Sequence, residues 1–320
     1  MKFKLIILFL LLTPYGCVKN TISIHIKPNG EFNITLNMQG DENDILDNDF
    51  SISNIENDPR WSITSTIGNN DIDTHQLIAQ KKFHPNEHVP QNFNIPNNMK
   101  IHPFLKHDIK VKYRNWGLYK TYSLNIQFQS RGVVNKYPKF INIINDPEIN
   151  ESGWMQEVFF YLFQETLHRT RIEFNQKAII ERELNTWLQQ EIATKTDSTI
   201  FEFFDDLKEE GLDLIMHPIN PSFYQEIDSI FHYLETEYII TQKLIDDEFE
   251  IKLTLPGILQ KSNHNELNQD TLKWIFDLKD FMNSDYEIYA FSKTVYPKRA
   301  LVLALLSLII CFFIVIKKRK

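Results

Sequence analysis

The sequence predicts an α+β fold: an antiparallel β domain formed by both ends of an exported body, an inserted helical section, and one C-terminal transmembrane helix. Three observations predict it. Apolar and polar residues alternate near both ends of the body, the pattern takes a helical period in the middle, and the stretch 300–316 is almost wholly apolar. The predicted parts are a lipoprotein-type signal peptide (1–16), two β-rich parts (17–149 and 242–298), a helical insert (150–241), a transmembrane helix (299–316) and a basic tail (317–320).

The first residues have the pattern of a signal peptide. A short basic start precedes the apolar run 5–12, which as a helix would rise only about 12 Å, far less than a bilayer. Gly16 directly before Cys17 resembles the lipobox of bacterial lipoproteins, although the two positions before the glycine depart from it. By that resemblance, cleavage would leave a lipid on Cys17. The alternative is ordinary signal cleavage nearby, with an incidental cysteine.

The C-terminal end predicts a membrane anchor. Residues 300–316 are apolar except for Ser307 and would span about 26 Å as a helix. The four cations at 317–320 favour a cytoplasmic C-terminus. We therefore expect a single-pass protein of the cell membrane, with its body on the extracytoplasmic, periplasmic or outer face. The tail also fits a retrieval signal of a type I protein of the eukaryotic secretory pathway, with glycosylation at Asn33 and Asn150; the lipobox-like cysteine favours the bacterial interpretation.

The body between the two ends is acidic. The chain has 34 Lys and Arg against 42 Asp and Glu, a net charge of −8. Without the cations of the two ends, the body carries about −15, which disfavours nucleic acid as a partner. The two cysteines, Cys17 and Cys311, lie in the predicted anchors, so the body has no disulfide and no cysteine-based zinc site.

Period-two alternation predicts the strands of the first part. Apolar residues alternate over 22–26 and 32–38 around Asn29-Gly30, the strongest local signal for a hairpin. Two segments rich in Asp, Asn or Pro, 41–49 and 84–108, predict loops. Further strands are expected at 61–67, 75–83, 109–114 and 122–129.

A helical period predicts the middle of the chain. We expect a helix from 154 to 192, interrupted or not, one that ends at Gly211, and one after Asn220-Pro221, which is a helix-starting pair. Strands then resume at 249–255, 274–278 and 286–290. Because both ends of the body would meet the same bilayer, the first and last strands are expected to run antiparallel and could be neighbours.

Several residues of the last part resemble a known family. Pro256-Gly257, Asn263, Trp274 and Ala290-Phe291-Ser292 precede the C-terminal apolar stretch, and the chain begins with the lipobox-like cysteine and the Asn-Gly hairpin. This order resembles the mycobacterial LppM-like group of lipoproteins, over residues 1 to about 50 and 256–320. The resemblance implies a small β domain that binds lipids or glycolipids at a cell envelope and is not an enzyme.

Two pairs of residues have the spacing of metal ligands. His84 and His88 stand four apart with Glu87 beside them, but the neighbouring prolines favour a solvated loop. Glu165 and His168 would share a helical face, as in di-iron proteins, yet the second copy that such sites need is missing, so an ordinary helix is favoured. The acidic loop 41–49 lacks the pattern of a calcium loop. We predict no metal, no cofactor and no catalytic residue.

The sequence favours a binding or scaffold protein whose ligand is a lipid, a glycolipid or an envelope protein. None of the usual motifs for a nucleophilic serine, a zinc protease, a phosphate loop or a dinucleotide is present. The alternative is an envelope hydrolase whose site is assembled only in space. The aromatic stretch 158–163 is expected to pack in the core, with a lipid-facing or partner-facing patch as the alternative.

Overall fold

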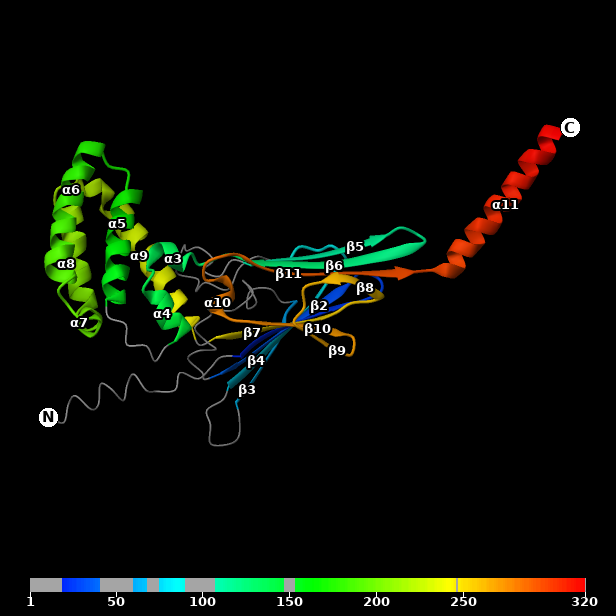
Figure 1. Ribbon diagram of the computed structural model, residues 1–320, viewed down its shortest axis with the longest axis horizontal. Helices are drawn as coiled ribbons and strands as arrows, with labels where there is room; N and C mark the ends of the chain where they lie inside the picture. The colour runs from blue at the N-terminus through cyan, green and yellow to red at the C-terminus, as the bar shows by residue number, and fades with distance from the viewer. Residues whose placement is uncertain are drawn as a thin grey trace.

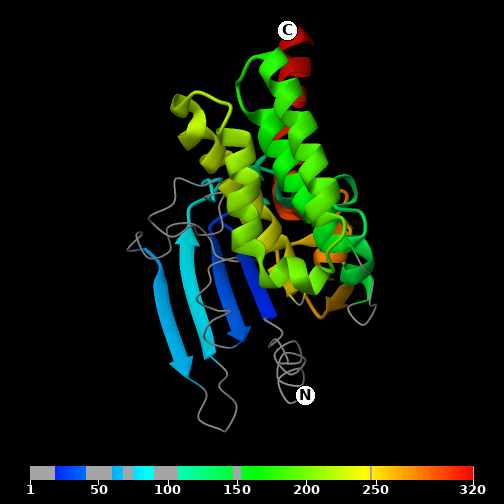
Figure 2. The same ribbon diagram turned by 90° about the vertical axis from the view of Figure 1, so that its left-hand side faces the viewer.

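The computed structural model describes residues 19–40, 60–67, 75–89, 107–146, 153–245 and 247–319. These form an elongated molecule with a helical unit at one end, two β-sheets in the middle and the helix α11 at the other end (Figure 1). The helices of residues 154–243, here called the helical unit, lie together beyond one end of the sheets (Figure 1), and Figure 2 shows the molecule from that end.

The larger sheet, sheet A, has seven strands in the order β3-β4-β2-β1-β7-β10-β9. The smaller sheet, sheet B, has four strands in the order β5-β6-β11-β8. The strands of sheet A are β1 (Lys19–Ile26), β2 (Phe32–Gly40), β3 (Ser62–Ile67), β4 (His75–Phe83), β7 (Glu248–Thr254), β9 (Glu266–Asn268) and β10 (Thr271–Phe276). Those of sheet B are β5 (His107–Asn115), β6 (Tyr119–Phe128), β8 (Ile258–Ser262) and β11 (Tyr286–Val295).

The helical section joins β6 to β7. It begins earlier than the sequence pattern indicated, with α3 (Val133–Lys136) and α4 (Phe140–Asn145). These helices are too short to show a helical period in the sequence. The rest consists of α5 (Trp154–Arg169), α6 (Phe174–Trp187), a π-helical turn (Leu188–Ile192), α7 (Asp197–Glu202), α8 (Phe204–Met216), a 3₁₀ turn (Pro221–Phe223) and α9 (Tyr224–Lys243). Two further helices, α10 (Leu278–Phe281) and α11 (Pro297–Arg319), flank β11.

Both ends of the described chain contribute strands and its middle is helical, so the α+β class is observed. Sheet A, however, is mixed rather than antiparallel, because β1 and β7 pair in parallel from Lys19↔Glu248 onward. Such a parallel pair requires a long connection, which the strands and helices between β1 and β7 provide. The expected pairing of first and last strands is wrong: β1 lies in sheet A, whereas β11 lies in sheet B between β6 and β8.

The two ends of the β region also lie far apart. β1 begins beside Glu248, the residue that follows the helical section, whereas β11 ends at Val295 and leads into α11. In Figure 1 these points are at opposite ends of the sheets. The first and last strands were expected to be neighbours because both ends of the body were placed at one bilayer.

No helix in the described residues is both long enough and apolar enough to cross a membrane. This finding contradicts the membrane-spanning helix predicted over 299–316, and with it the single-pass topology, the membrane partnership through that helix and the cytoplasmic tail at 317–320.

The helical unit has its own packed interior, in which Gly211 is a close-contact residue. The sequence predicted that a helix ends there, but Gly211 lies inside α8 and is buried. A Cβ added to it would overlap the Phe163 ring and come within 3.0 Å of the Trp187 ring. Glycine is therefore needed at this position for close helix packing rather than for a helix end.

Candidate functional site

A groove opens between the two sheets, at the end of the β region nearer α11. Its volume is about 450 Å³. Sheet A lines it with the end of β1, the residues that follow β7 and β9, and the start of β10, and sheet B lines it with β8 and β11. The hairpin tip after β1 is held to sheet B, because Lys120 Nζ and the Tyr122 hydroxyl both donate to the Pro28 carbonyl, each at 2.9 Å.

The depth of the groove is apolar. Ile26 and Leu272 form part of its wall and are each only 2% exposed. Leu255 and Leu259 are half-buried above them, and Leu267 stands at the rim with 58% of its surface exposed. A volume of several hundred Å³ with an apolar lining and a few polar groups is typical of a small-ligand site.

The polar groups of the groove are few and lie at different depths. His25 and Asp270 are exposed. The Thr254 hydroxyl lies 3.3 Å from that of Thr271, so the two share a hydrogen bond. Ser292 is completely buried, and its hydroxyl donates to the Pro256 carbonyl at 2.7 Å. The exposed groups are therefore free to meet a polar part of a ligand, whereas the buried serine holds the wall.

The turn between β7 and β8 requires glycine. Gly257 has φ +88°, a left-handed conformation, and a Cβ placed on it would lie 2.6 Å from the Lys293 carbonyl oxygen. Only glycine lets the turn pack directly against the backbone of β11. Together with the bond between Ser292 and Pro256, this contact fixes one end of the groove.

The indole of Trp274 joins the two sheets. Trp274 is fully buried in β10, and its Nε1 donates to the Asn263 side-chain oxygen at 3.0 Å. The same oxygen accepts from the Tyr289 backbone N–H of β11 at 2.9 Å, and the Asn263 amide donates to the Glu287 carbonyl at 2.6 Å. Asn263 thus satisfies groups from both sheets. The positions that carried the family resemblance form two separate contacts: Asn263 with Trp274, and Ser292 with Pro256 of the Pro-Gly turn.

Two other hollows lie on the helical unit. One, of about 600 Å³, is lined only by residues between 178 and 190, from a single helical stretch. The other, of about 470 Å³, lies between α6 and the end of α8. Charged and amide side chains line most of both, whereas the groove between the sheets is lined by four leucines and an isoleucine beside its polar groups.

The His84–His88 segment forms a tight turn after β4. Both histidines are exposed. Glu87 accepts from the His84 backbone N–H and from Arg60 Nη1, each at 2.8 Å, so its carboxylate is already bound. Asn86 binds the backbone of Tyr113 through both side-chain atoms, at 2.7 and 3.2 Å, and so covers the free edge of β5.

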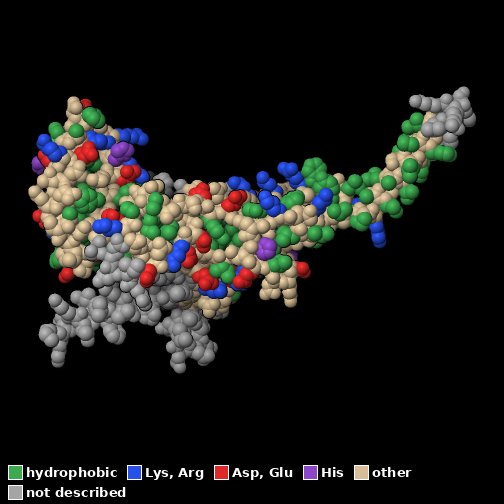
Figure 3. All heavy atoms as spheres, viewed as in Figure 1, with side chains coloured by type: hydrophobic (Ala, Val, Ile, Leu, Met, Phe, Trp, Pro, Cys, Tyr) green, Lys and Arg blue, Asp and Glu red, His purple; other side chains and the backbone are tan. Residues whose placement is uncertain are grey.

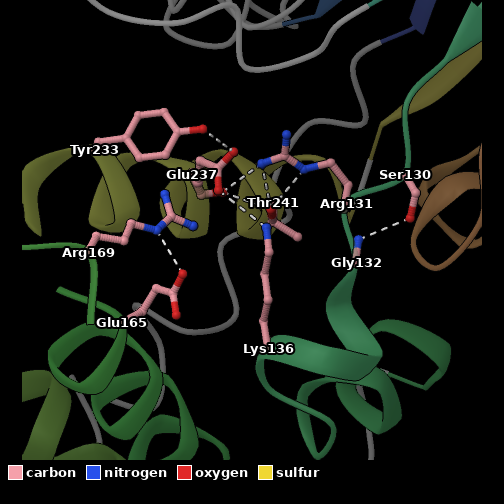
Figure 4. Close-up of polar contacts among 9 residues, drawn as sticks. All are labelled: Ser130, Arg131, Gly132, Lys136, Glu165, Arg169, Tyr233, Glu237 and Thr241. Carbon is pink, nitrogen blue, oxygen red and sulfur yellow. Dashed lines mark hydrogen bonds and ion pairs between the residues drawn. The ribbon is translucent and has the colours of Figure 1, made fainter. Parts of the chain in front are cut away.

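The Glu165–His168 pair lies on α5. The Glu165 carboxylate accepts from Arg169 Nε at 2.7 Å (Figure 4), and His168 is exposed. Within the described ranges, no three His, Cys, Asp or Glu side chains are close enough to hold a metal ion.

The remaining sequence candidates are buried or not described. Val158, Phe159, Leu162 and Phe163 are each 0% exposed and belong to the helical core, so the structure shows packing there rather than an apolar surface patch. Cys17 lies outside the described residues.

A polar cluster at the junction of the helical and β parts gave no sequence signal, because its members are spread over 130–241. Arg131 is 5% exposed and donates to the Thr241 hydroxyl at 2.9 and 3.1 Å and to the Glu237 carbonyl at 2.8 Å. Lys136 Nζ lies 3.2 Å from the Glu237 carboxylate, and the Tyr233 hydroxyl donates to it at 2.9 Å (Figure 4). The cluster ties α3 and the segment between β6 and α3 to α9.

The charges of this cluster compensate one another. Burial alone would raise the pKa of Glu237, but the charges of Lys136 and Arg131 and the bond from Tyr233 lower it below its ordinary value. Burial, followed by the neighbouring carboxylate of Glu237, raises the pKa of Tyr233 to about 12. These directions indicate a buried structural network rather than a proton-transferring site.

A second charged cluster lies on the outer face of sheet A. The Glu250 side chain is 3% exposed and accepts from Lys252 Nζ and Lys273 Nζ, each at 2.9 Å, and from the Thr21 hydroxyl at 3.1 Å. Lys19 Nζ is 4.0 Å away. Burial alone would raise the pKa of Glu250, but the bonds from the lysines lower it to about 2. This carboxylate fastens β1, β7 and β10 together.

Comparisons with known proteins add little. No protein-family model matches the chain, and no curated protein matches it. A structural likeness is found to the NMR structure of the folded domain of the Mycobacterium tuberculosis LppM protein. It has 8% identity and a TM-score of 0.31, and it covers 90% of this chain and 96% of that chain. A TM-score this low is only a weak hint at the level of the fold and supports no argument about function.

Proposed function

We propose that this chain is a binding protein that holds an apolar or amphipathic ligand, of the lipid or glycolipid class, in the groove between its two sheets. The observation that carries the proposal is the apolar depth of that groove, with Ile26 and Leu272 in its wall and a volume of about 450 Å³. Transfer of apolar surface from water is favourable by about 25 cal/mol per Å², so an aliphatic chain in the groove would be stabilised.

The position of the polar groups supports an amphipathic ligand. His25 and Asp270 are exposed and line the groove together with the half-exposed Thr254. A head group or a sugar there could hydrogen-bond, while the aliphatic part lay against Leu255 and Leu259. Membership in the LppM-like group of lipoproteins belongs to the same proposal, and it rests on the sequence resemblance alone.

The experiment is a binding titration of the full chain with a fluorescent fatty-acid probe, followed by displacement with a phospholipid and with a glycolipid. Leu267→Glu places a charge at the rim without disturbing a buried residue. We expect it to weaken probe binding about tenfold, or by about 1.4 kcal/mol, because the aliphatic part of the ligand loses an apolar contact at the rim and meets a charge instead.

The matched control is Ile179→Glu, which changes an apolar side chain of similar exposure (51%) on α6, away from the groove. It should leave the affinity for the probe unchanged. Absence of saturable binding, or equal weakening by both substitutions, would refute the groove as the binding site.

A further inference from the structure

The outer face of sheet B carries a group of cations. Lys110, Lys112 and Arg114 alternate along β5 and are exposed. The strand register places Lys261 opposite Phe291 and Lys293 opposite Thr121, which in turn faces Arg114, so all of these side chains share one face. Figure 3 shows blue side chains gathered along the upper edge of the β region, toward α11. We call this surface the basic face.

Three cations of the basic face have no acidic ion-pair partner in the described part of the chain. Lys112, Arg114 and Lys261 are exposed and form no ion pair with any side chain in the described part. Lys261 Nζ lies 5.0 Å from the ring centre of Tyr289, and Lys293 Nζ lies 4.2 Å from that of Tyr119. These rings are therefore covered by ammonium groups and are not open platforms for stacking of bases.

An acidic stripe lies at the other end of the molecule, on α7 and α8. Its members are all exposed and recur at intervals of three and four residues, so they follow one side of the helical stretch. Like charges at this spacing destabilise a helix by about 0.2–0.5 kcal/mol per pair, and none of them has an ion-pair partner among the described side chains. The stripe consists of Glu202, Asp205, Asp206, Glu209, Glu210 and Asp213.

The two surfaces match in length and in charge. From Lys110 to Arg114 the strand extends about 14 Å, and from Glu202 to Asp213 a helix extends about 16 Å. They cannot meet within one chain, because α8 and β5 lie in different parts of the elongated molecule, α8 in the terminal helical unit (Figure 1).

We propose that the basic face binds the acidic stripe of a second copy of this chain, head to tail. The basic face of one copy then meets the acidic stripe of the next, so the contact is heterologous. Each copy can bind two others, one through each surface, which generates a ring or an open chain of subunits. A second copy is favoured over nucleic acid because the net charge of −8 opposes a polyanion and because the tyrosine rings are covered.

The test is sedimentation velocity of the full chain at about 0.01 M and about 1 M salt, where the Debye length is about 30 Å and about 3 Å. We expect association at low salt and monomer at high salt. One triple variant reverses the charge of the basic face and carries Lys112→Glu, Arg114→Glu and Lys261→Glu. The other reverses the charge of the acidic stripe and carries Asp205→Lys, Glu209→Lys and Asp213→Lys. Either triple variant alone should remain monomeric at low salt.

The decisive result comes from combining the two reversals. An equal mixture of the two triple variants should associate again, and so should one chain that carries all six substitutions, because opposite charges then face each other once more. As a control, Lys27→Glu/Arg171→Glu/Arg182→Glu changes the same net charge elsewhere and should leave association intact.

Two outcomes would overturn the proposal. One is a wild-type chain that stays monomeric at low salt, including the case in which it instead binds heparin as a foreign polyanion. The other is a mixture of the two triple variants that fails to associate although each variant is folded by circular dichroism.

Discussion

Glu250 provides the sharpest test of how sheet A is held together. Its carboxylate is 3% exposed and bonds to Lys252 and Lys273 at 2.9 Å, which join β7 to β10. We predict that Glu250→Gln destabilises the fold at neutral pH, because the neutral amide keeps the shape of the side chain but loses its attraction to the lysines.

The size of the effect follows from the pKa of Glu250. Lowering it from its ordinary value of 4.5 to about 2 corresponds to about 3 kcal/mol, at about 1.4 kcal/mol per pH unit. The lysine side chains are 24–50% exposed, so solvent screens part of this attraction. We therefore expect Glu250→Gln to lower the free energy of unfolding by about 1–2 kcal/mol at pH 7.

The contribution of Glu250 to the free energy of unfolding should fall as the pH is lowered. The pKa of Glu250 is lowered in the folded state, so its contribution is complete above about pH 4.5 and is lost as the pH falls toward 2. Urea unfolding monitored by tryptophan fluorescence should show a difference between wild type and variant that is constant near neutrality and disappears near pH 2.

The matched control is Glu266→Gln, whose carboxylate is 58% exposed and 3.4 Å from Lys273. It should change the free energy of unfolding by less than about 0.5 kcal/mol. The reasoning is refuted if Glu250→Gln costs no more than this control at pH 7, or if its cost persists undiminished at pH 2.

Three further predictions concern the junctions of the fold, each checked by urea unfolding. Gly257→Ala should cost about 2 kcal/mol or more, because its Cβ would lie 2.6 Å from a backbone oxygen of β11; equal stability would contradict the required left-handed turn. Arg131→Met should cost about 3 kcal/mol, since it leaves the acceptors on α9 buried without their donor; a loss below about 1 kcal/mol would mean that the cluster is not structural. Asn263→Ala should cost about 2 kcal/mol by removing the acceptor of the Trp274 indole, with a matching change in tryptophan fluorescence, and an unchanged emission spectrum would argue against that bond.

Local patterns predicted the elements whose residues bury one face. Alternation over 22–38 corresponds to β1 and β2, in which Ile24 pairs with Ile34 and both are buried. The helix after Asn220-Pro221 is α9, whose predicted apolar positions Ile227 and Leu234 are 0% and 1% exposed. These succeed because a residue's face depends only on the local period.

Patterns along the chain failed where the answer depended on contacts between distant segments. Glycine at position 211 is typical of a helix end, yet Gly211 lies inside α8 and permits this helix to approach Phe163. The parallel pairing of β1 with β7 joins residues more than two hundred positions apart, and period-two alternation is the same for parallel and antiparallel neighbours. The groove likewise draws on β1, β7, β8, β10 and β11, which lie far apart in the sequence.

By itself the sequence determined the α+β class, the alternation of its strands, the helical middle and the acidic balance of the chain, because each follows from residue type and short-range spacing. Only the tertiary structure decided that the strands divide into two sheets and that an apolar groove opens between them. It also decided that Arg131 and Glu250 are buried with their partners, and that the positive and negative surfaces lie on different parts of the molecule. These depend on which distant segments pack together, and packing is a property of the folded chain rather than of any local stretch.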